Sequence, residues 1–291
     1  MNYEGQICRS PMEKGSFMLP VSVGCAYNQC RFCMLFKHLT YRQLPLEEIK
    51  AEIDRVANLG GRPERVFLGD GSAFSLPTEK LITILSWLRE AFPECAGVSM
   101  DATVQSILFK SESELKELHS LGLTDLYIGV ECAEEDILLK IKKGNTLAEA
   151  EKAIEKLHRC SVGYDAHIMT GICGHGRGEE NGKALAAFFN RTRPVRICNF
   201  SLFLHKRAPL YEDVLNGSFR PADERENLLE ELRLLENLSD FGVQYDGLHD
   251  FVPIRVRGFL PKDREKLCAQ LRQAIEKYDA SPETIPYAVV E

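Results

Sequence analysis

The chain has 291 residues, of which 44% are hydrophobic and 27% are charged, so it can bury one large core, and its length permits one barrel-sized domain or two small ones. No apolar run approaches the roughly 20 residues that cross a bilayer, and residues 1–14 lack the charged-then-apolar order of a signal peptide, so we expect a soluble cytoplasmic protein without a membrane partner. The net charge of −7 excludes a global basic field for nucleic acid, leaves a local basic patch open, and favours a small-molecule substrate.

Strand-like and helix-like segments alternate along residues 17–238. The expected strands are residues 17–23, 65–69, 97–104, 124–130, 163–172 and 195–204. The expected helices begin near residues 46, 77, 111, 146, 179 and 223. Six βα units without a repeat or a linker indicate an α/β protein, and this pattern alone leaves open a partial parallel barrel or a doubly wound open sheet.

We expect three regions, namely an N-terminal arm at 1–15, a core at 16–240 and a C-terminal extension at 241–291. Within the extension, residues 251–256 are expected to form a short strand and Pro261 to start a helix. Residues 280–291 contain two prolines and are expected to be irregular.

Three cysteines, Cys25, Cys30 and Cys33, lie within nine residues directly after the first expected strand. The chain has ten cysteines, and without an export signal these indicate reduced thiols rather than a disulfide framework. Three closely spaced thiolates can hold an iron-sulfur cluster and leave one iron open to an outside ligand. A zinc site or unrelated core cysteines are the alternatives, but the second CxxC or HxxxH pair of a zinc site is missing from the sequence.

Residues 24–34, Gly-Cys-Ala-Tyr-Asn-Gln-Cys-Arg-Phe-Cys-Met, resemble the cluster motif of the radical S-adenosylmethionine (SAM) superfamily. The Cys-x4-Cys-x2-Cys spacing is similar to that of an elongator-like and coproporphyrinogen-oxidase-like subgroup, whereas the commonest superfamily spacing is Cys-x3-Cys-x2-Cys. The resemblance implies a partial (β/α)6 TIM-like barrel whose open side is covered by the C-terminal extension. It also implies a 4Fe-4S cluster that binds SAM, oxygen sensitivity, and a one-electron donor such as flavodoxin or ferredoxin.

Two candidate ligand motifs follow expected strands. Gly69, Asp70 and Gly71 form a turn in which the glycines let the backbone approach a ligand and the carboxylate can bind an ammonium group, with an ordinary glycine turn as the alternative. Glu131 ends the fourth strand, where a buried carboxylate needs a ligand or a cation. The resemblance implies that residues 69–71 contact the methionine amino group, that Glu131 contacts the ribose hydroxyls and that Phe32 lies near the adenine. An ion pair at the barrel rim is the alternative for Glu131.

The fifth strand leads into a glycine-rich stretch that holds further candidates. The resemblance places Gly171 near the cofactor and Arg177 at the methionine carboxylate, with a solvated charge as the alternative for Arg177. Cys173 and His175 could donate a hydrogen atom or a proton near the radical and are candidate catalytic residues, or they could be structural.

The turn after the sixth strand contains Leu204, Lys206 and Arg207. By resemblance, Leu204 is assigned to the cofactor site. Lys206 and Arg207 occupy a turn that commonly reads Pro-Gly-Thr in related sequences, and they could bind an anionic substrate or form a solvated charged turn. His249 lies in the segment expected to line the substrate and is a further candidate catalytic residue.

The resemblance implies an enzyme that cleaves SAM to methionine and a 5′-deoxyadenosyl radical, which abstracts hydrogen from a small substrate that could be anionic. A radical lyase or methyltransferase acting on a nucleoside-like or tetrapyrrole-like substrate is the alternative within this class. A non-catalytic iron-sulfur redox or sensor protein is the alternative from another class.

Overall fold

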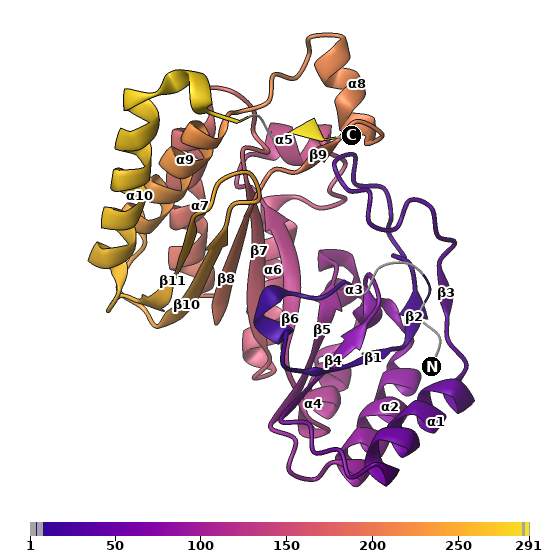
Figure 1. Cartoon of the computed structure of the whole chain (residues 1–291). Coiled ribbons are helices and arrows are strands. Elements are labelled where there is room, and N and C mark those ends of the chain that lie inside the picture. Colours follow the sequence, from indigo (N-terminus) through magenta and orange to yellow (C-terminus); the bar gives the residue numbers. More distant parts are fainter. Residues whose placement is uncertain (1–3, 5–7, 287–288, 291) are drawn as a thin grey trace. The chain divides into compact units, whose positions relative to one another are not determined.

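The computed structural model describes residues 4, 8–286 and 289–290. The chain forms two compact units. The first unit consists of Met1–Asn28, Leu35–Ile128 and Glu149–Tyr164, and the second of Gln29–Met34, Gly129–Ala148 and Asp165–Glu291. Each unit combines helices with mostly parallel strands, which confirms the predicted α/β class (Figure 1).

Four parallel strands, in the order β1, β4, β5 and β6, form the sheet of the first unit. They are β1 (Phe17–Pro20), β4 (Arg65–Gly69), β5 (Gly97–Ala102) and β6 (Leu123–Glu131), the last of which runs on into the second unit. A short antiparallel pair is formed by β2 (Ser22–Val23) and β3 (Arg42–Gln43). Residues 66–69 of β4 are buried without interruption, as is typical of a central parallel strand that is covered on both faces.

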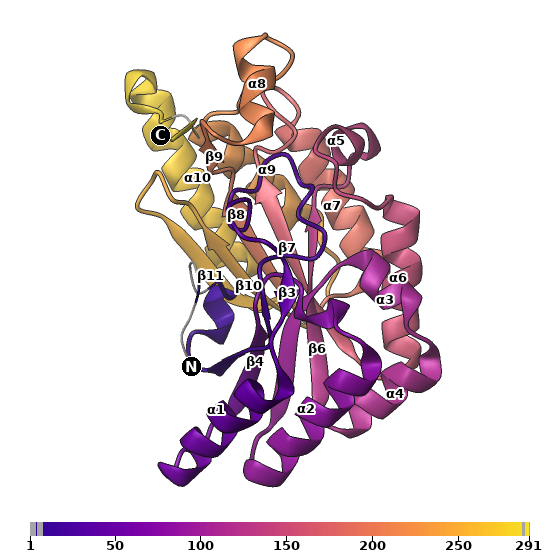
Figure 2. The same cartoon turned by 90° about the vertical axis from the view of Figure 1, so that its right-hand side faces the viewer.

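The helices of the first unit bury one apolar face each. They are η1 (Pro11–Glu13), α1 (Leu46–Asn58), η2 (Ala73–Ser75), α2 (Thr78–Ala91), α3 (Val104–Phe109), α4 (Glu112–Ser120) and α6 (Leu147–Arg159), whose first two residues belong to the second unit. Figures 1 and 2 show α1 and α2 side by side along the strands. The start of α4 is the predicted capping box, in which Ser111 Oγ accepts from Glu114 N and Glu114 Oε2 accepts from Ser111 N.

A buried carboxylate fastens the N-terminal residues to the sheet of the first unit. Glu13 of η1 is 1% exposed, and its Oε1 accepts hydrogen bonds from Ser99 Oγ at 2.8 Å and Tyr127 Oη at 3.0 Å. Burial would raise the pKa of Glu13, but hydrogen bonds from Ser16, Ser99 and Tyr127 and the charge of Arg65 lower it below its ordinary value. The charged form of Glu13 is therefore part of the folded structure.

The second unit has three parallel strands in the order β7 (Gly163–Thr170), β8 (Arg196–Ser201) and β10 (Val243–Leu248), and β11 (Arg255–Leu260) is antiparallel to β10. A separate parallel pair joins β9 (Leu204–His205) to β12 (Val289–Val290). The helices are α5 (Glu135–Lys140), α7 (Gly178–Thr192), α8 (Pro209–Leu215), α9 (Glu224–Asn237), α10 (Arg264–Ala280) and η3 (Pro282–Thr284). Helix α9 packs against both α7 and α10, and the three lie beside β8, β10 and β11 (Figure 1).

The six expected strands correspond to β1, β4, β5, β6, β7 and β8, and the six helix starts expected between residues 46 and 223 coincide with helices to within one residue. The helix expected to start at Pro261 begins at Arg264. Four differences have local causes. The first strand ends at Pro20, and Val104 begins α3 because Thr103 caps that helix by accepting from Ser106 N. Residues 243–248 form a strand that was not expected, and the strand expected at 251–256 begins only at Arg255. The first part of the extension therefore continues the strands of the second unit.

Candidate functional site

In the first unit, the turn after β4 contacts the backbone beside Cys25. A Cβ atom at Gly71 would lie 2.2 Å from Gly24 O and 2.7 Å from Cys25 Cα, and Gly71 has a φ of +52°. Both the close approach and the left-handed backbone require glycine at this position. The predicted ligand turn and the first predicted cluster cysteine are thus neighbours within one unit.

Asp70 is the charged group of this turn. Its Oδ1 accepts from Gly71 N at 3.0 Å, and its side chain is enclosed so that the residue is 7% exposed. Burial raises the pKa of Asp70 to about 6, although the backbone N–H groups of Gly71 and Gly24 oppose the rise. A buried carboxyl group with a raised pKa gains most from a bound cation, which fits the predicted contact with an ammonium group.

Ser72 also contacts the cysteine segment and was not predicted from the sequence. The Cys25 thiol donates to Ser72 Oγ at 3.9 Å, and the same oxygen accepts from Ala26 N at 3.3 Å. The sequence did contain one indication of this contact. Ser72 directly follows the Gly-Asp-Gly turn, so it lies next to the point where Gly71 meets the backbone of the cysteine segment. Ser72 fixes the start of the cysteine segment against the turn.

In the second unit, Glu131 ends β6 in a left-handed conformation, with φ of +63°. Lys143 Nζ donates to Glu131 Oε1 at 2.7 Å, and the side chains of Lys143 and Glu131 are 15% and 10% exposed. Non-glycine residues adopt positive φ rarely, and such residues cluster at functional sites. The structure therefore has the ion pair that the sequence left open as an alternative for Glu131.

Lys143 has a favourable charge interaction with two of the predicted cluster cysteines. Burial would lower the pKa of the Lys143 ammonium, but Glu131, Cys30 and Cys33 together raise it above its ordinary value. This lysine was not among the predicted site residues, although it follows Glu131 by one short helix. The cation, the carboxylate and the two cysteines all belong to the second unit.

The three predicted cluster cysteines are divided between the units, with Cys25 in the first and Cys30 and Cys33 in the second. All three are in the thiol form and partly exposed, and the other seven cysteines are thiols as well. In the part of the chain that the structure describes, no group of three or more His, Cys, Asp or Glu side chains is arranged to hold a metal ion. The donor type fits an iron-sulfur cluster, because all three residues carry partly exposed thiols.

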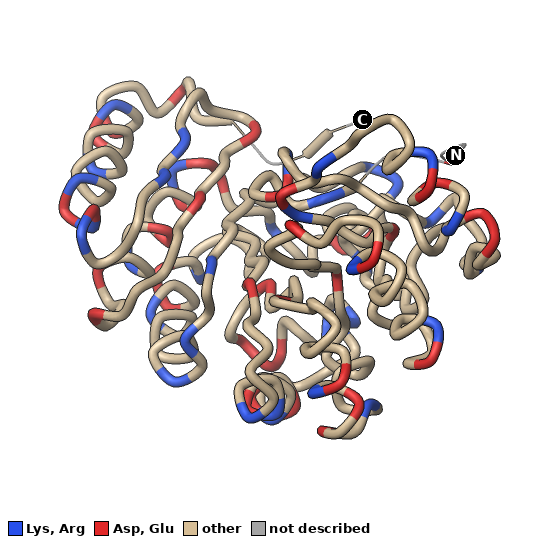
Figure 3. Tube along the Cα trace, turned by 90° about the horizontal axis from the view of Figure 1, so that it is seen from below, with Lys and Arg blue, Asp and Glu red and all other residues tan. Residues whose placement is uncertain are grey.

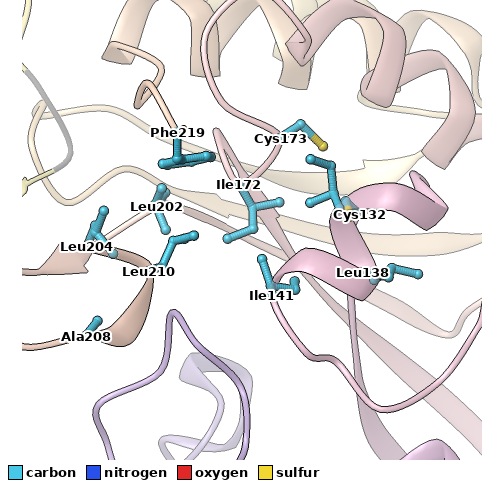
Figure 4. Close-up of a cluster of buried hydrophobic side chains, with 11 residues drawn as sticks. Cys132, Leu138, Ile141, Ile172, Cys173, Leu202, Leu204, Ala208, Leu210 and Phe219 are labelled. Atoms are coloured by element: carbon cyan, nitrogen blue, oxygen red, sulfur yellow. The ribbon is translucent and has the colours of Figure 1, made fainter. Parts of the chain in front are cut away.

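Cys173 and Leu204 lie in an apolar cluster of the second unit (Figure 4). The Cys173 thiol shares a hydrogen bond with Cys132, and this bond together with burial raises the pKa of Cys173 well above its ordinary value, so the thiol stays protonated. Leu204 is completely buried, and Phe32 packs against the cluster from the cysteine segment. Packing in the apolar cluster accounts for the position of Leu204. These packing contacts do not support the cofactor contact that the resemblance assigned to it.

The glycine-rich stretch after β7 is bound to neighbouring elements of the second unit. Gly171 N donates to Glu230 Oε2 at 2.9 Å, and a Cβ atom at Gly171 would lie 2.4 Å from Asn227 Oδ1. His175 Nδ1 is 2.9 Å from Glu226 Oε2. Each of these contacts is made with α9. The structure accounts for Gly171 and His175 by packing and capping.

Arg177 is held by two carboxylates. Its guanidinium donates to Asp136 at 2.6 Å and to Glu134 at 2.9 Å. The hydrogen bond to Asp136 is the main cause that raises the pKa of Arg177 above its ordinary value. The predicted contact with the methionine carboxylate has no support here, because the guanidinium charge is already matched.

His249 corrects one prediction. Its side chain is 0% exposed and lies between Glu224 Oε2 at 2.9 Å and Glu231 Oε2 at 2.7 Å. Burial would lower the pKa of His249, but Glu231 and Glu224 raise it to about 10. This histidine is a buried imidazolium that neutralises two carboxylates of α9, so it does not line a substrate site as expected.

Lys206 and Arg207 form an exposed turn after β9. Lys206 N donates to Val290 O at 2.9 Å, and Arg207 N donates to His205 Nδ1 at 3.0 Å. The backbone of the turn is thus fixed, both cationic residues are exposed, and Arg207 Nη2 lies 3.3 Å from His205 Nε2. Elsewhere, basic and acidic residues are interspersed along the chain (Figure 3). Among the described residues, none of the helices has the length and apolar character needed to cross a bilayer.

Comparison with known proteins identifies a family. Residues 19–186, more than half of the chain, match the family model described as the Radical SAM superfamily. The proteins of this family bind a 4Fe-4S cluster and SAM, which agrees with the predicted cofactors. No match was found among curated protein sequences.

Solved structures share the fold at low sequence identity. Methylornithine synthase (PylB) has a TM-score of 0.54 at 16% identity, over 77% of this chain and 64% of that one. The radical SAM methyltransferase TsrM from Kitasatospora setae, with cobalamin and a 4Fe-4S cluster bound, has a TM-score of 0.56 at 18% identity, over 70% of this chain and 40% of that one. Elp3 from the archaeon Methanocaldococcus infernus has a TM-score of 0.57 at 17% identity, over 91% of this chain and 63% of that one.

These likenesses confirm the predicted fold class, the partial TIM-like barrel of radical SAM proteins, and include the elongator protein of the predicted subgroup. The chain spans between 40% and 64% of the length of these three proteins.

Proposed function

We propose that this chain, which belongs to the radical SAM superfamily, is an enzyme that removes a hydrogen atom from an unreactive C–H bond of a small anionic molecule. When bound, the 4Fe-4S cluster and SAM supply the one-electron cleavage that gives methionine and a 5′-deoxyadenosyl radical. The electron would come from a one-electron donor of the flavodoxin or ferredoxin class.

One observation carries this proposal. In each unit, taken by itself, the segment of a predicted SAM ligand interacts with a predicted cluster cysteine. In the first unit the Gly71 backbone lies against Cys25, and in the second unit Lys143, the cation paired with Glu131, has a favourable charge interaction with Cys30 and Cys33. Segments more than forty residues apart in the first unit, and about a hundred apart in the second, would not meet in this way by local sequence alone.

Different residues would bind the cluster and the different parts of SAM. Cys25, Cys30 and Cys33 would hold the cluster through their thiolates. Asp70 would accept hydrogen bonds from the methionine ammonium group, and this cation would offset the cost of burying the charged carboxylate, which its raised pKa reflects. Glu131 would accept from the ribose hydroxyls while Lys143 keeps its carboxylate charged and oriented.

An anionic substrate is supported by the turn after β9. Lys206 and Arg207 are adjacent, exposed and cationic, and their backbone is held by β12 and His205. A carboxylate or phosphate on the substrate would be bound by these two side chains. Replacing both by glutamine should raise the KM for such a substrate and leave SAM binding unchanged.

Binding of SAM by the anaerobically reconstituted protein tests the proposal. We expect SAM to change the EPR spectrum of the reduced cluster, and D70N to weaken SAM binding by about 10-fold to 100-fold, the size of one hydrogen bond to a charged group. D54N is the matched control, because Asp54 lies in the same unit on α1 and its side chain is 48% exposed. If the wild-type protein with full iron content shows the same spectrum with and without saturating SAM, the proposal fails.

A further inference from the structure

We infer that Lys143 sets the reduction potential of the cluster that Cys30 and Cys33 help to hold, by placing a fixed positive charge beside it. This inference rests on the proposed function, since it requires a redox-active cluster at these cysteines. It assigns to Lys143 a role in tuning electron uptake that is separate from binding SAM.

The ion pair of Lys143 with Glu131 is built into the fold of the second unit. The pair is largely buried and short, with 2.7 Å between Lys143 Nζ and Glu131 Oε1. A Cβ atom at Gly129 would lie 2.5 Å from Lys143 Nζ and 2.3 Å from Glu131 Oε1, so a larger residue there would displace the ends of both side chains. Glu131 is in the left-handed region, with φ of +63°, which turns its side chain at the end of β6. The ammonium group is therefore held in one place.

The cysteine segment is fastened to the same turn that carries Lys143. Arg31, the residue after Cys30, donates its backbone N–H to Ile141 O at 2.9 Å, and its carbonyl accepts from Leu210 N at 2.9 Å. The Arg31 guanidinium is bidentate on Asp213, at 2.8 and 2.9 Å. These contacts fix the segment that carries Cys30 on both sides and bring its backbone next to the turn that carries Lys143.

The turn directs one of its two lysines to the cysteines. Lys142 has φ of +52° and is exposed, whereas Lys143 is turned inward to Glu131. The favourable charge interaction of Lys143 with Cys30 and Cys33 agrees with this direction. Lys142 therefore provides a matched control with the same side chain, the same turn and a different environment.

Reduction adds one electron to the cluster, and the electrostatic sign follows from that step. A buried cation nearby stabilises the added negative charge and raises the potential, and a buried carboxylate does the opposite. Removing Lys143 should lower the potential, and removing Glu131 should raise it. Damage to packing would instead move both variants in the same direction or lower their iron content.

An EPR-monitored redox titration of the SAM-free, reconstituted protein tests the inference. At the potential where half of the wild-type clusters are reduced, we expect the ratio of reduced to oxidised clusters to fall on the order of tenfold in K143Q, a midpoint shift of about 59 mV for one electron. E131Q should raise the same ratio, and the double variant should lie between the two single variants. K143R and the control K142Q should stay within about twofold of wild type.

The possible outcomes distinguish failure of the proposed function from failure of the role inferred for Lys143. A wild-type protein that assembles no redox-active cluster contradicts the proposed function. A wild-type cluster whose midpoint is unchanged in K143Q, or shifts in the same direction in K143Q and E131Q at full iron content, overturns the role of Lys143 alone. If K143Q does not retain iron, E131Q and K143R still test the inference. It requires a higher midpoint potential in E131Q and an unchanged midpoint potential in K143R.

Discussion

Replacing Asp70 by asparagine should make the cluster-free protein more stable at alkaline pH while it weakens SAM binding. Asp70 is 7% exposed, and burial raises its pKa from the ordinary 3.8 to about 6. A carboxyl group with a raised pKa in the folded state binds its proton more tightly there than in the unfolded state. Below pH 3.8 Asp70 is protonated in both states and does not destabilise the fold. As the pH rises the folded protein must bury a charged carboxylate, and the full loss of folding free energy is present above about pH 6. The difference corresponds to about 3 kcal/mol at 1.36 kcal/mol per unit of pKa.

Urea unfolding at pH 4, 6 and 8 under reducing conditions measures this effect. We expect D70N and wild type to be equally stable at pH 4, and D70N to be more stable at pH 8 by about 1–3 kcal/mol, since the asparagine oxygen can still accept from Gly71 N. The exposed control D54N should show no such dependence on pH. If D70N is no more stable than wild type at pH 8, then charged Asp70 is not destabilised by burial, and the case for a cation-binding carboxylate at this turn is refuted.

Three further substitutions test the packing of both units. G71A should reduce iron content and stability strongly, because its Cβ atom would meet Gly24 O at 2.2 Å, whereas G60A has a similar positive φ with nothing within 4 Å and should cost only about 1–2 kcal/mol. E13Q should destabilise the protein by about 1–3 kcal/mol at pH 7 in urea unfolding, and the difference should shrink as the pH falls below 4.5, because the charged Glu13 that it removes has a lowered pKa. H249Q should cost roughly 3–5 kcal/mol at pH 7 by leaving Glu224 and Glu231 buried without a cation. The stability that His249 supplies is fully present below pH 6.5 and is lost as the pH rises through about 10, so wild type should lose more stability than H249Q between pH 7 and 10.

Features of the fold that depend on neighbouring residues could be predicted from the sequence. The capping box at Ser111 and Glu114 and the helix start after Pro77 are set within one turn of chain, and both are present. The strand at 65–69 is a short apolar run with glycine at its end, and it has the predicted bounds. The same applies to the cysteine motif, because residues 24–34 carry the resemblance to the family within one short segment.

Features that depend on distant residues were missed. Strand β10 contains Asp246 and Gly247, which are unfavourable in a strand, and it is stabilised by pairing with β8 and by Arg255 of β11, which donates to Asp246 at 2.6 and 2.8 Å. A pattern of hydrophobicity does not contain such pairings. The helix α3 was missed because its capping residue, Thr103, follows the strand without an intervening turn.

In the candidate site, too, local motifs could be predicted from the sequence, whereas contacts with distant residues could not. The motifs at residues 69–71 and at Glu131 were predicted by their position after strands, but the sequence did not predict their neighbours. His249 donates hydrogen bonds to two glutamates of α9, 18 and 25 residues away, so a histidine that resembled a site residue is a buried counter-charge. Lys143 lies two residues beyond Ile141, and only the folded chain places it beside Cys30.

Release of 5′-deoxyadenosine tests the central claim most directly. The reconstituted protein is given dithionite and SAM under anaerobic conditions, and the products are measured by liquid chromatography and mass spectrometry. We predict that the wild-type protein releases 5′-deoxyadenosine and methionine and that Cys30→Ala, which removes a cluster ligand, releases none. An iron-replete wild-type protein that leaves SAM intact would contradict the account.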